Sequence, residues 1–122
     1  MPTYEAGEFE PPAPVVRARV RGPGDLVSAD VPMLIDTGAD VSIIPLSIAT
    51  AVGAEAEPSH VLIQFYGGNE LTYSEAELQV EFLRYRFRGP FLLAESGYGI
   101  LGRNILNLLV VTLDGPHLQW AL

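Results

Sequence analysis

The chain has 122 residues, 48% of them hydrophobic and 18% charged, which is enough for one small domain with its own hydrophobic core. This composition excludes a disordered chain, a collagen and a coiled coil, and no apolar run reaches the ~20 residues that a transmembrane helix needs. The net charge is −8, and all seven basic residues are arginines. Because such a charge opposes binding to nucleic acid and to anionic membranes, neither is expected as a partner.

Cysteine is absent, which excludes disulfides, thiolate metal sites and thiol nucleophiles. The two histidines, His60 and His117, lie far apart and form no cluster with ligand spacing, so neither a metal nor another cofactor is expected. The first residues lack the basic and apolar regions of a signal peptide, and a cytoplasmic location is therefore expected.

The first part of the chain predicts an extended segment followed by strands. Residues 1–14 contain four prolines and three glutamates, a composition that predicts a flexible lead-in before a domain at 15–122. Alternating apolar residues predict a strand over 15–20, and the apolar run at 31–35 predicts a second one.

One short helix is predicted over 45–52, because proline stands at its start and Gly53 directly after its end. The glycines of Tyr66–Glu70 then predict a hairpin between strands at 61–65 and 71–73. Further strands are predicted at 78–82, 85–88, 91–94, 109–113 and 118–122. Many short strands with a single short helix indicate a small all-β barrel or sandwich.

The segment that carries chemistry is Met-Leu-Ile-Asp-Thr-Gly-Ala-Asp at Met33–Asp40. Asp36 directly follows an apolar run, so its carboxylate is expected at a strand end, partly shielded from water. Thr37 offers a hydroxyl that can donate and accept hydrogen bonds, and Gly38 lets another backbone or a ligand come close. Taken alone, the tripeptide also fits a strand that ends in a polar turn.

A second segment, Tyr98–Asn104, repeats the order of apolar pair, glycine and polar cap. With the Asp-Thr-Gly-Ala motif, the glycine hairpin and this Leu-Gly-Arg in order, the sequence resembles the retropepsin family, the single-domain aspartic proteases of retroviral type. It looks closest to the bacterial members, and the resemblance covers residues 15–122. It implies an all-β fold: a small closed barrel with one short helix and one lobe per chain.

The resemblance also implies a role for each matching residue. The catalytic residues would be Asp36, Thr37 and Gly38. The substrate would be bound by Ala39, Asp40, Tyr66, Gly67 and Gly68, the last three at the tip of a flap. Structural support would come from Leu101, Gly102 and Arg103, with Arg103 paired to Asp40. The sequence departs from the family's pattern at Val41 and Asn104, where relatives often carry an acid.

Aspartic proteolysis needs two carboxylates that share one proton, whereas this chain contains one Asp-Thr-Gly. The expected function is therefore that of an aspartic endopeptidase active as a homodimer, in which water held between two Asp36 carboxylates attacks a peptide bond. The expected partners are a second copy of the chain and a peptide or protein substrate. Leu118, Trp120 and Leu122 alternate along the last predicted strand and offer an apolar interface or, equally, an ordinary closing strand.

Two alternatives stay open at this point. A non-catalytic peptide-binding or assembly module on the same fold would keep the groove but lack the paired carboxylates, and a monomeric chain would favour it. The acidic, proline-rich lead-in at 1–14 also allows a zymogen-like arrangement in which it occupies the cleft.

Overall fold

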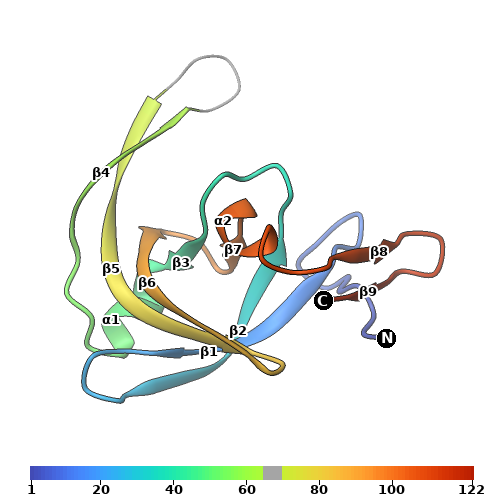
Figure 1. Cartoon of the computed structure of the whole chain (residues 1–122), viewed down its shortest axis with the longest axis horizontal. Helices are drawn as coiled ribbons and strands as arrows, with labels where there is room; N and C mark the ends of the chain where they lie inside the picture. The colour runs from blue at the N-terminus through green and yellow to red at the C-terminus, as the bar shows by residue number, and fades with distance from the viewer. Residues whose placement is uncertain (65–69) are drawn as a thin grey trace.

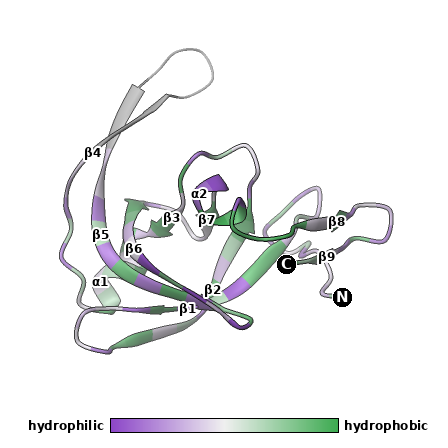
Figure 2. Cartoon of the chain, viewed as in Figure 1, coloured by the Kyte–Doolittle hydropathy of each residue, from purple (hydrophilic) through white to green (hydrophobic). Residues whose placement is uncertain are grey.

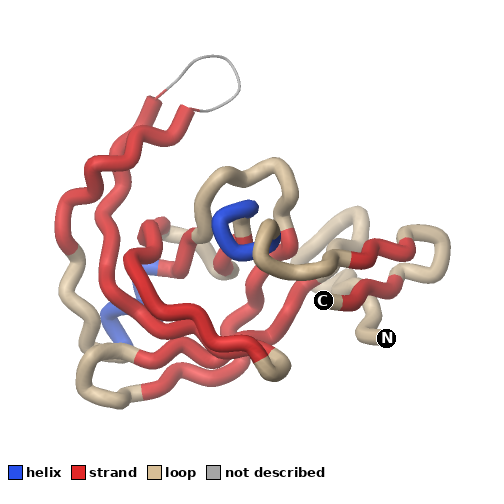
Figure 3. The backbone as a smooth tube through the Cα atoms, in the orientation of Figure 1, coloured by secondary structure: helices blue, strands red, loops and turns tan. Residues whose placement is uncertain are grey.

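The structure is a computed structural model that describes the backbone of residues 1–64 and 70–122 and the side chains of residues 1–59 and 73–122. Nearly all of its regular structure is β (Figures 1 and 3). In chain order the elements are β1 (Val15–Arg21), β2 (Val27–Ile35), β3 (Ile43–Pro45), α1 (Leu46–Ala51), β4 (Glu57–Gln64), β5 (Glu70–Phe82), β6 (Tyr85–Ala94), β7 (Gly99–Leu101), α2 (Arg103–Leu106), β8 (Thr112–Asp114) and β9 (Gln119–Ala121).

Six strands close into a barrel in the order β1-β2-β7-β3-β6-β5, because β5 pairs back onto β1. Strand β4 lies beside β5 outside this ring, and β8 and β9 form a separate two-stranded sheet. The β2–β7 and β3–β6 pairs are parallel, and the other barrel pairs are antiparallel. The predicted all-β closed barrel with only short helices is confirmed.

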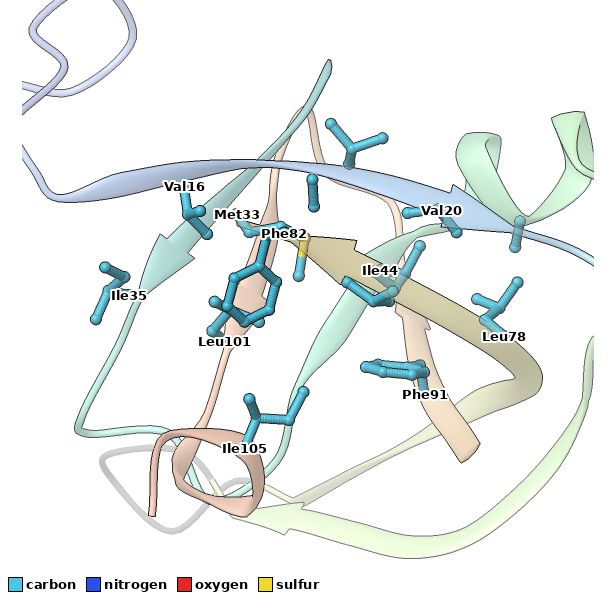
Figure 4. Close-up of a cluster of buried hydrophobic side chains, with 14 of the residues drawn as sticks. Val16, Val20, Met33, Ile35, Ile44, Leu78, Phe82, Phe91, Leu101 and Ile105 are labelled. Carbon is cyan, nitrogen blue, oxygen red and sulfur yellow. The ribbon is translucent and has the colours of Figure 1, made fainter. Parts of the chain in front are cut away.

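The strands form because their side chains alternate between the barrel interior and solvent. In β1, Val16, Ala18 and Val20 are buried while Arg17 and Arg19 are exposed, as the period of two requires. The barrel interior is filled by the buried side chains shown in Figure 4, among them Val16, Val20, Met33, Ile35, Ile44, Leu78, Phe82, Phe91, Leu101 and Ile105. One hydrophobic core therefore holds every barrel strand together with α2.

Strand β6 differs from the prediction of two strands broken at Gly89-Pro90, because it continues through both residues. Strand β3 pairs with β6 only from Leu92 onward, and the Leu92 N–H points toward β3, where it donates to the carbonyl of Ser42 at 3.4 Å. The nitrogen of Pro90 faces the same edge two residues earlier, where β3 is no longer present. The missing donor therefore removes no ladder hydrogen bond, and the strand tolerates the proline.

The helices are short, as predicted, but there are two of them among the described residues. The helix expected at 45–52 is α1, and Gly53 follows it with φ +75°, the left-handed conformation typical of a helix end. The second, α2, is a single turn directly after Gly102, and it buries Ile105 and Leu106 in the core.

Both chain ends pack at one end of the barrel. The Tyr4 N–H donates to the carbonyl of Leu118 at 2.7 Å, and the Trp120 N–H donates to the carbonyl of Pro2 at 3.0 Å. The Glu5 carboxylate pairs with Arg17 at 2.5 Å, and the Phe9 ring contacts the Tyr98 ring edge-on with centroids 4.9 Å apart. The segment 1–14 thus lies against the barrel; its flexibility stays a prediction.

Trp120 does not take the interface position that was offered for it in the last strand. Its side chain is 3% exposed and belongs to the core of its own chain, so it is not available to an interface. Leu118 is 45% exposed. Within the described part of the chain, no helix is long and apolar enough to cross a membrane.

Candidate active site

The Asp-Thr-Gly segment forms a tight loop directly after β2. The Asp36 N–H donates to the carbonyl of Leu101 at 3.0 Å, which continues the parallel β2–β7 pairing by one residue. The Gly38 N–H donates to Oδ1 of Asp36 at 2.9 Å, and the Ala39 N–H donates to the Asp36 carbonyl at 3.2 Å. The half-buried carboxylate is therefore held in one orientation by its own loop.

The segment after β7 lies against this loop along its whole length. The Arg103 N–H donates to the carbonyl of Ala39 at 2.8 Å, and the Asn104 N–H donates to that of Asp40 at 3.2 Å. A Cβ added to Gly102 would lie 2.4 Å from the Val41 carbonyl oxygen, a separation that backbone cannot relieve cheaply. Glycine at position 102 thus permits the two segments to pack backbone against backbone.

The Arg103 side chain adds a third connection between the two segments. Its Nη1 donates to the carbonyl of Thr37 at 2.6 Å, and its Nη2 contacts the Asp40 carboxylate. Both side chains are substantially exposed, so the ion pair itself contributes little to stability. Its effect is positional, because one guanidinium spans both ends of the turn that follows Asp36.

Ser42, which was not predicted to belong to the site, is 2% exposed. Its Oγ accepts a hydrogen bond from the Gly102 N–H at 2.9 Å and donates one to Oδ1 of Asn104 at 2.8 Å. Asn104 is one of the departures from the family's pattern, and here its side chain serves as the acceptor for this buried hydroxyl. The only signal in the sequence is a serine inside the apolar run 41–44.

Replacing Ser42 with alanine is expected to lower the free energy of unfolding by about 1–3 kcal/mol, because the buried Gly102 N–H would lose its acceptor. Ser47→Ala is the matched control, since Ser47 is exposed on α1 and its loss should change stability by less than about 0.5 kcal/mol. Urea unfolding of both variants measures the difference. Equal stabilities of the two variants would contradict the bracing role of Ser42.

Of the other residues predicted for the site, three lie in the Asp36 loop and three lie outside the described residues. Thr37 and Gly38 are exposed beside Asp36, and Ala39 is half-buried. Tyr66, Gly67 and Gly68 lie outside the described residues. The strands on either side of them, β4 and β5, pair with each other up to Gln64 and Glu70.

The histidines take no part in this loop as far as the structure describes them. His117 approaches Asp114 with its Nδ1, 2.9 Å from a carboxylate oxygen, and the side chain of His60 lies outside the described set. Among the side chains that are described, no three His, Asp or Glu residues are grouped so that they could hold a metal ion.

The comparisons with known proteins agree with this architecture. A family model described as aspartyl protease matches residues 16–105, from β1 to α2. The match includes both the Asp36 loop and the segment after β7 that packs against it. The chain belongs to this family. The solved structure of the EIAV protease complexed with the inhibitor HBY-793 is similar, with a TM-score of 0.61 and 20% sequence identity over 84% of this chain and 90% of that chain. The resemblance to the retropepsin-like aspartic proteases is confirmed, while closeness to the bacterial members stays a prediction.

Proposed function

We propose that the protein is an aspartic endopeptidase that acts as a homodimer, with Asp36 of each chain forming the catalytic pair. The observation that carries this proposal is a single braced Asp-Thr-Gly loop in a one-lobed member of the aspartyl protease family. One carboxylate cannot both take a proton from water and polarise the carbonyl under attack. A second Asp36, related by a two-fold axis, supplies the missing group.

An exposed apolar segment after α2 supports the dimer. Leu109 and Val111 pack against the core, whereas Leu108 and Val110 point outward and are 69% and 82% exposed. Residues 108–111 are irregular, and the strand predicted over 109–113 begins only with β8 at Thr112. Exposed apolar side chains next to buried ones offer a contact surface for another protein chain. A second copy of the chain would cover the outward side chains of Leu108 and Val110. This segment follows closely after Arg103 in the chain and therefore lies close to the Asp36 loop. Since two copies carry twice the charge of −8, apolar contacts must supply the attraction.

The mechanism follows from the pair. An extended peptide lies in the cleft between the two chains, next to the Gly38 backbones, and Tyr66, Gly67 and Gly68 are expected to contact it from the opposite side. The ionised Asp36 takes a proton from water while the water oxygen adds to the carbonyl carbon, and the protonated Asp36 of the other chain polarises the carbonyl oxygen. Transfer of a proton to the amide nitrogen then breaks the C–N bond, with no covalent intermediate. Ala39 and Asp40 contact the substrate backbone.

The test is hydrolysis of a diverse peptide library by the purified chain between about pH 4 and about pH 7. The expected result is cleavage that a pepstatin-like inhibitor suppresses and whose rate rises with the square of chain concentration when the chain is dilute. Absence of cleavage by a chain shown to be dimeric would contradict the proposed function and favour a peptide-binding module.

A further inference from the structure

Six of the seven arginines of this acidic chain lie on strands β1 and β6 or in the turn between β5 and β6. Four of these form a compact surface, here called the arginine face: Arg19 and Arg21 of β1, and Arg86 and Arg88 of β6, on either side of Gln79 and Glu81 of β5. Arg19 and Arg86 both pair in register with Glu81, and Arg21 and Arg88 both pair in register with Gln79. Residues directly opposite one another in a sheet share a face.

The burial pattern places this face on the outside of the barrel. The neighbouring residues Val20, Val80 and Phe82 are buried in the core, so the alternate residues of β1 and β5 point outward. Arg19, Arg86 and Arg88 are exposed. Figure 2 shows hydrophilic colour along β6 near its turn, where β5, β6 and β1 lie next to one another.

The face has more cations than carboxylates. Glu81 accepts hydrogen bonds from Gln79 at 2.6 Å and from Nε of Arg21 at 3.5 Å, and it lies 3.8 Å from Arg86. These contacts, the one from Gln79 first, lower the pKa of Glu81 and keep it ionised. Two arginines thus share one carboxylate, and Asp25 adds only a 3.9 Å contact to Arg21 at the edge. Arg19 and Arg88 have no ion pair within the described part of the chain.

We propose that the arginine face binds a short acidic segment of a partner protein in extended conformation. Two strand spacings separate Arg19 from Arg86 by about 10 Å, and two residues along β1 or β6 span about 7 Å. Side chains on one side of an extended peptide also repeat every ~7 Å, so alternate carboxylates match the two rows of arginines. Guanidinium groups bind carboxylates in a bidentate manner, and every cation of this chain is an arginine.

A short segment fits better than a long polyanion such as nucleic acid. Toward β4, the outer side of β5 continues with Glu77 and Glu75, and Glu75 pairs in register with Glu57. This acidic surface would repel any anion that extends past the arginine face along β5. The proposal does not depend on peptidase activity.

The test is fluorescence anisotropy with a labelled peptide of alternating serine and glutamate, in the Asp36→Asn background so that the probe stays intact. Arg19→Gln/Arg88→Gln is expected to weaken binding about tenfold, since two exposed ion pairs are lost. Glu81→Gln is expected to tighten it about threefold, because it frees Arg21 and Arg86. The matched control is Ser47→Asp/Thr50→Glu, which adds the same net charge on exposed positions of α1 and should leave the Kd within about twofold.

The decisive result is that Arg19→Gln/Arg88→Gln weakens peptide binding while Glu81→Gln tightens it, because damage to the fold would weaken binding in both variants. The inference is overturned if the double arginine variant binds like the control, if Glu81→Gln weakens binding, or if a peptide with glutamine in place of glutamate binds equally well. It is also overturned if an oligonucleotide or phosphatidylserine vesicles bind more tightly than the peptide through the same arginines.

Discussion

Replacing Asp36 with asparagine is expected to lower peptidase activity by about 10⁴-fold, the upper end for a general acid–base group. In the proposed dimer the substitution removes both members of the pair at once, the one that takes the proton from water and the one that polarises the carbonyl. Asparagine keeps a side-chain oxygen that can still accept the Gly38 N–H. The loop is therefore expected to keep its shape, and sedimentation should find the variant dimeric like the parent.

The matched control is Asp30→Asn on the same strand, β2. Asp30 is exposed with φ 61°, a conformation that asparagine adopts readily, and the substitution makes the same change of charge. Its kcat/KM on a cleavable peptide should equal that of the parent chain. An Asp36→Asn chain that keeps its activity while Asp30→Asn behaves identically would remove Asp36 from the mechanism.

Introducing aspartate at Val110 is expected to weaken the dimer about 100-fold and to reduce activity in parallel at low chain concentration. The two-fold axis places the new charge in the interface twice, and an unpaired charge buried among apolar side chains carries a large desolvation cost. Because Val110 is 82% exposed within one chain, the fold of the single chain should be unaffected. Sedimentation gives the dissociation constant, and circular dichroism checks the fold.

Leu83→Asp is the control for this prediction. Leu83 is 63% exposed in the turn between β5 and β6, far along the chain from the apolar segment after α2. Its substitution should change neither the dissociation constant nor the activity. A Val110→Asp chain that dimerises like Leu83→Asp would place the interface elsewhere, and it would leave the assignment of Asp36 intact.

Much of the fold can be predicted because the decisive signals are local. Alternation of valine and arginine marks β1 with its buried and exposed sides, and Gly53 marks the end of α1. The Asp36 loop and the Leu-Gly-Arg at 101–103 are recognisable because both are short, contiguous and ordered in the chain. The local conformation of such a contiguous motif depends mainly on residues within the motif itself.

The features that could not be predicted depend on segments distant in sequence. Pro90 stays within β6 because β3 ends before reaching it, which no local pattern records. Ser42 becomes a buried bridge only when the Asp36 loop meets the segment after β7, 60 residues further on. Trp120 alternates with Leu118 and Leu122 in a pattern that suits an interface strand and a core strand equally. Only its burial in the folded chain shows that it belongs to the core.

The measurement that tests the central claim most directly mixes the parent chain with Asp36→Asn at constant total concentration, after subunit exchange is complete. If each active unit needs an Asp36 from both chains, activity falls with the square of the parent fraction, so an equal mixture keeps about one quarter of it. A linear decline, with about half of the activity left in the equal mixture, would contradict a catalytic pair shared between two chains.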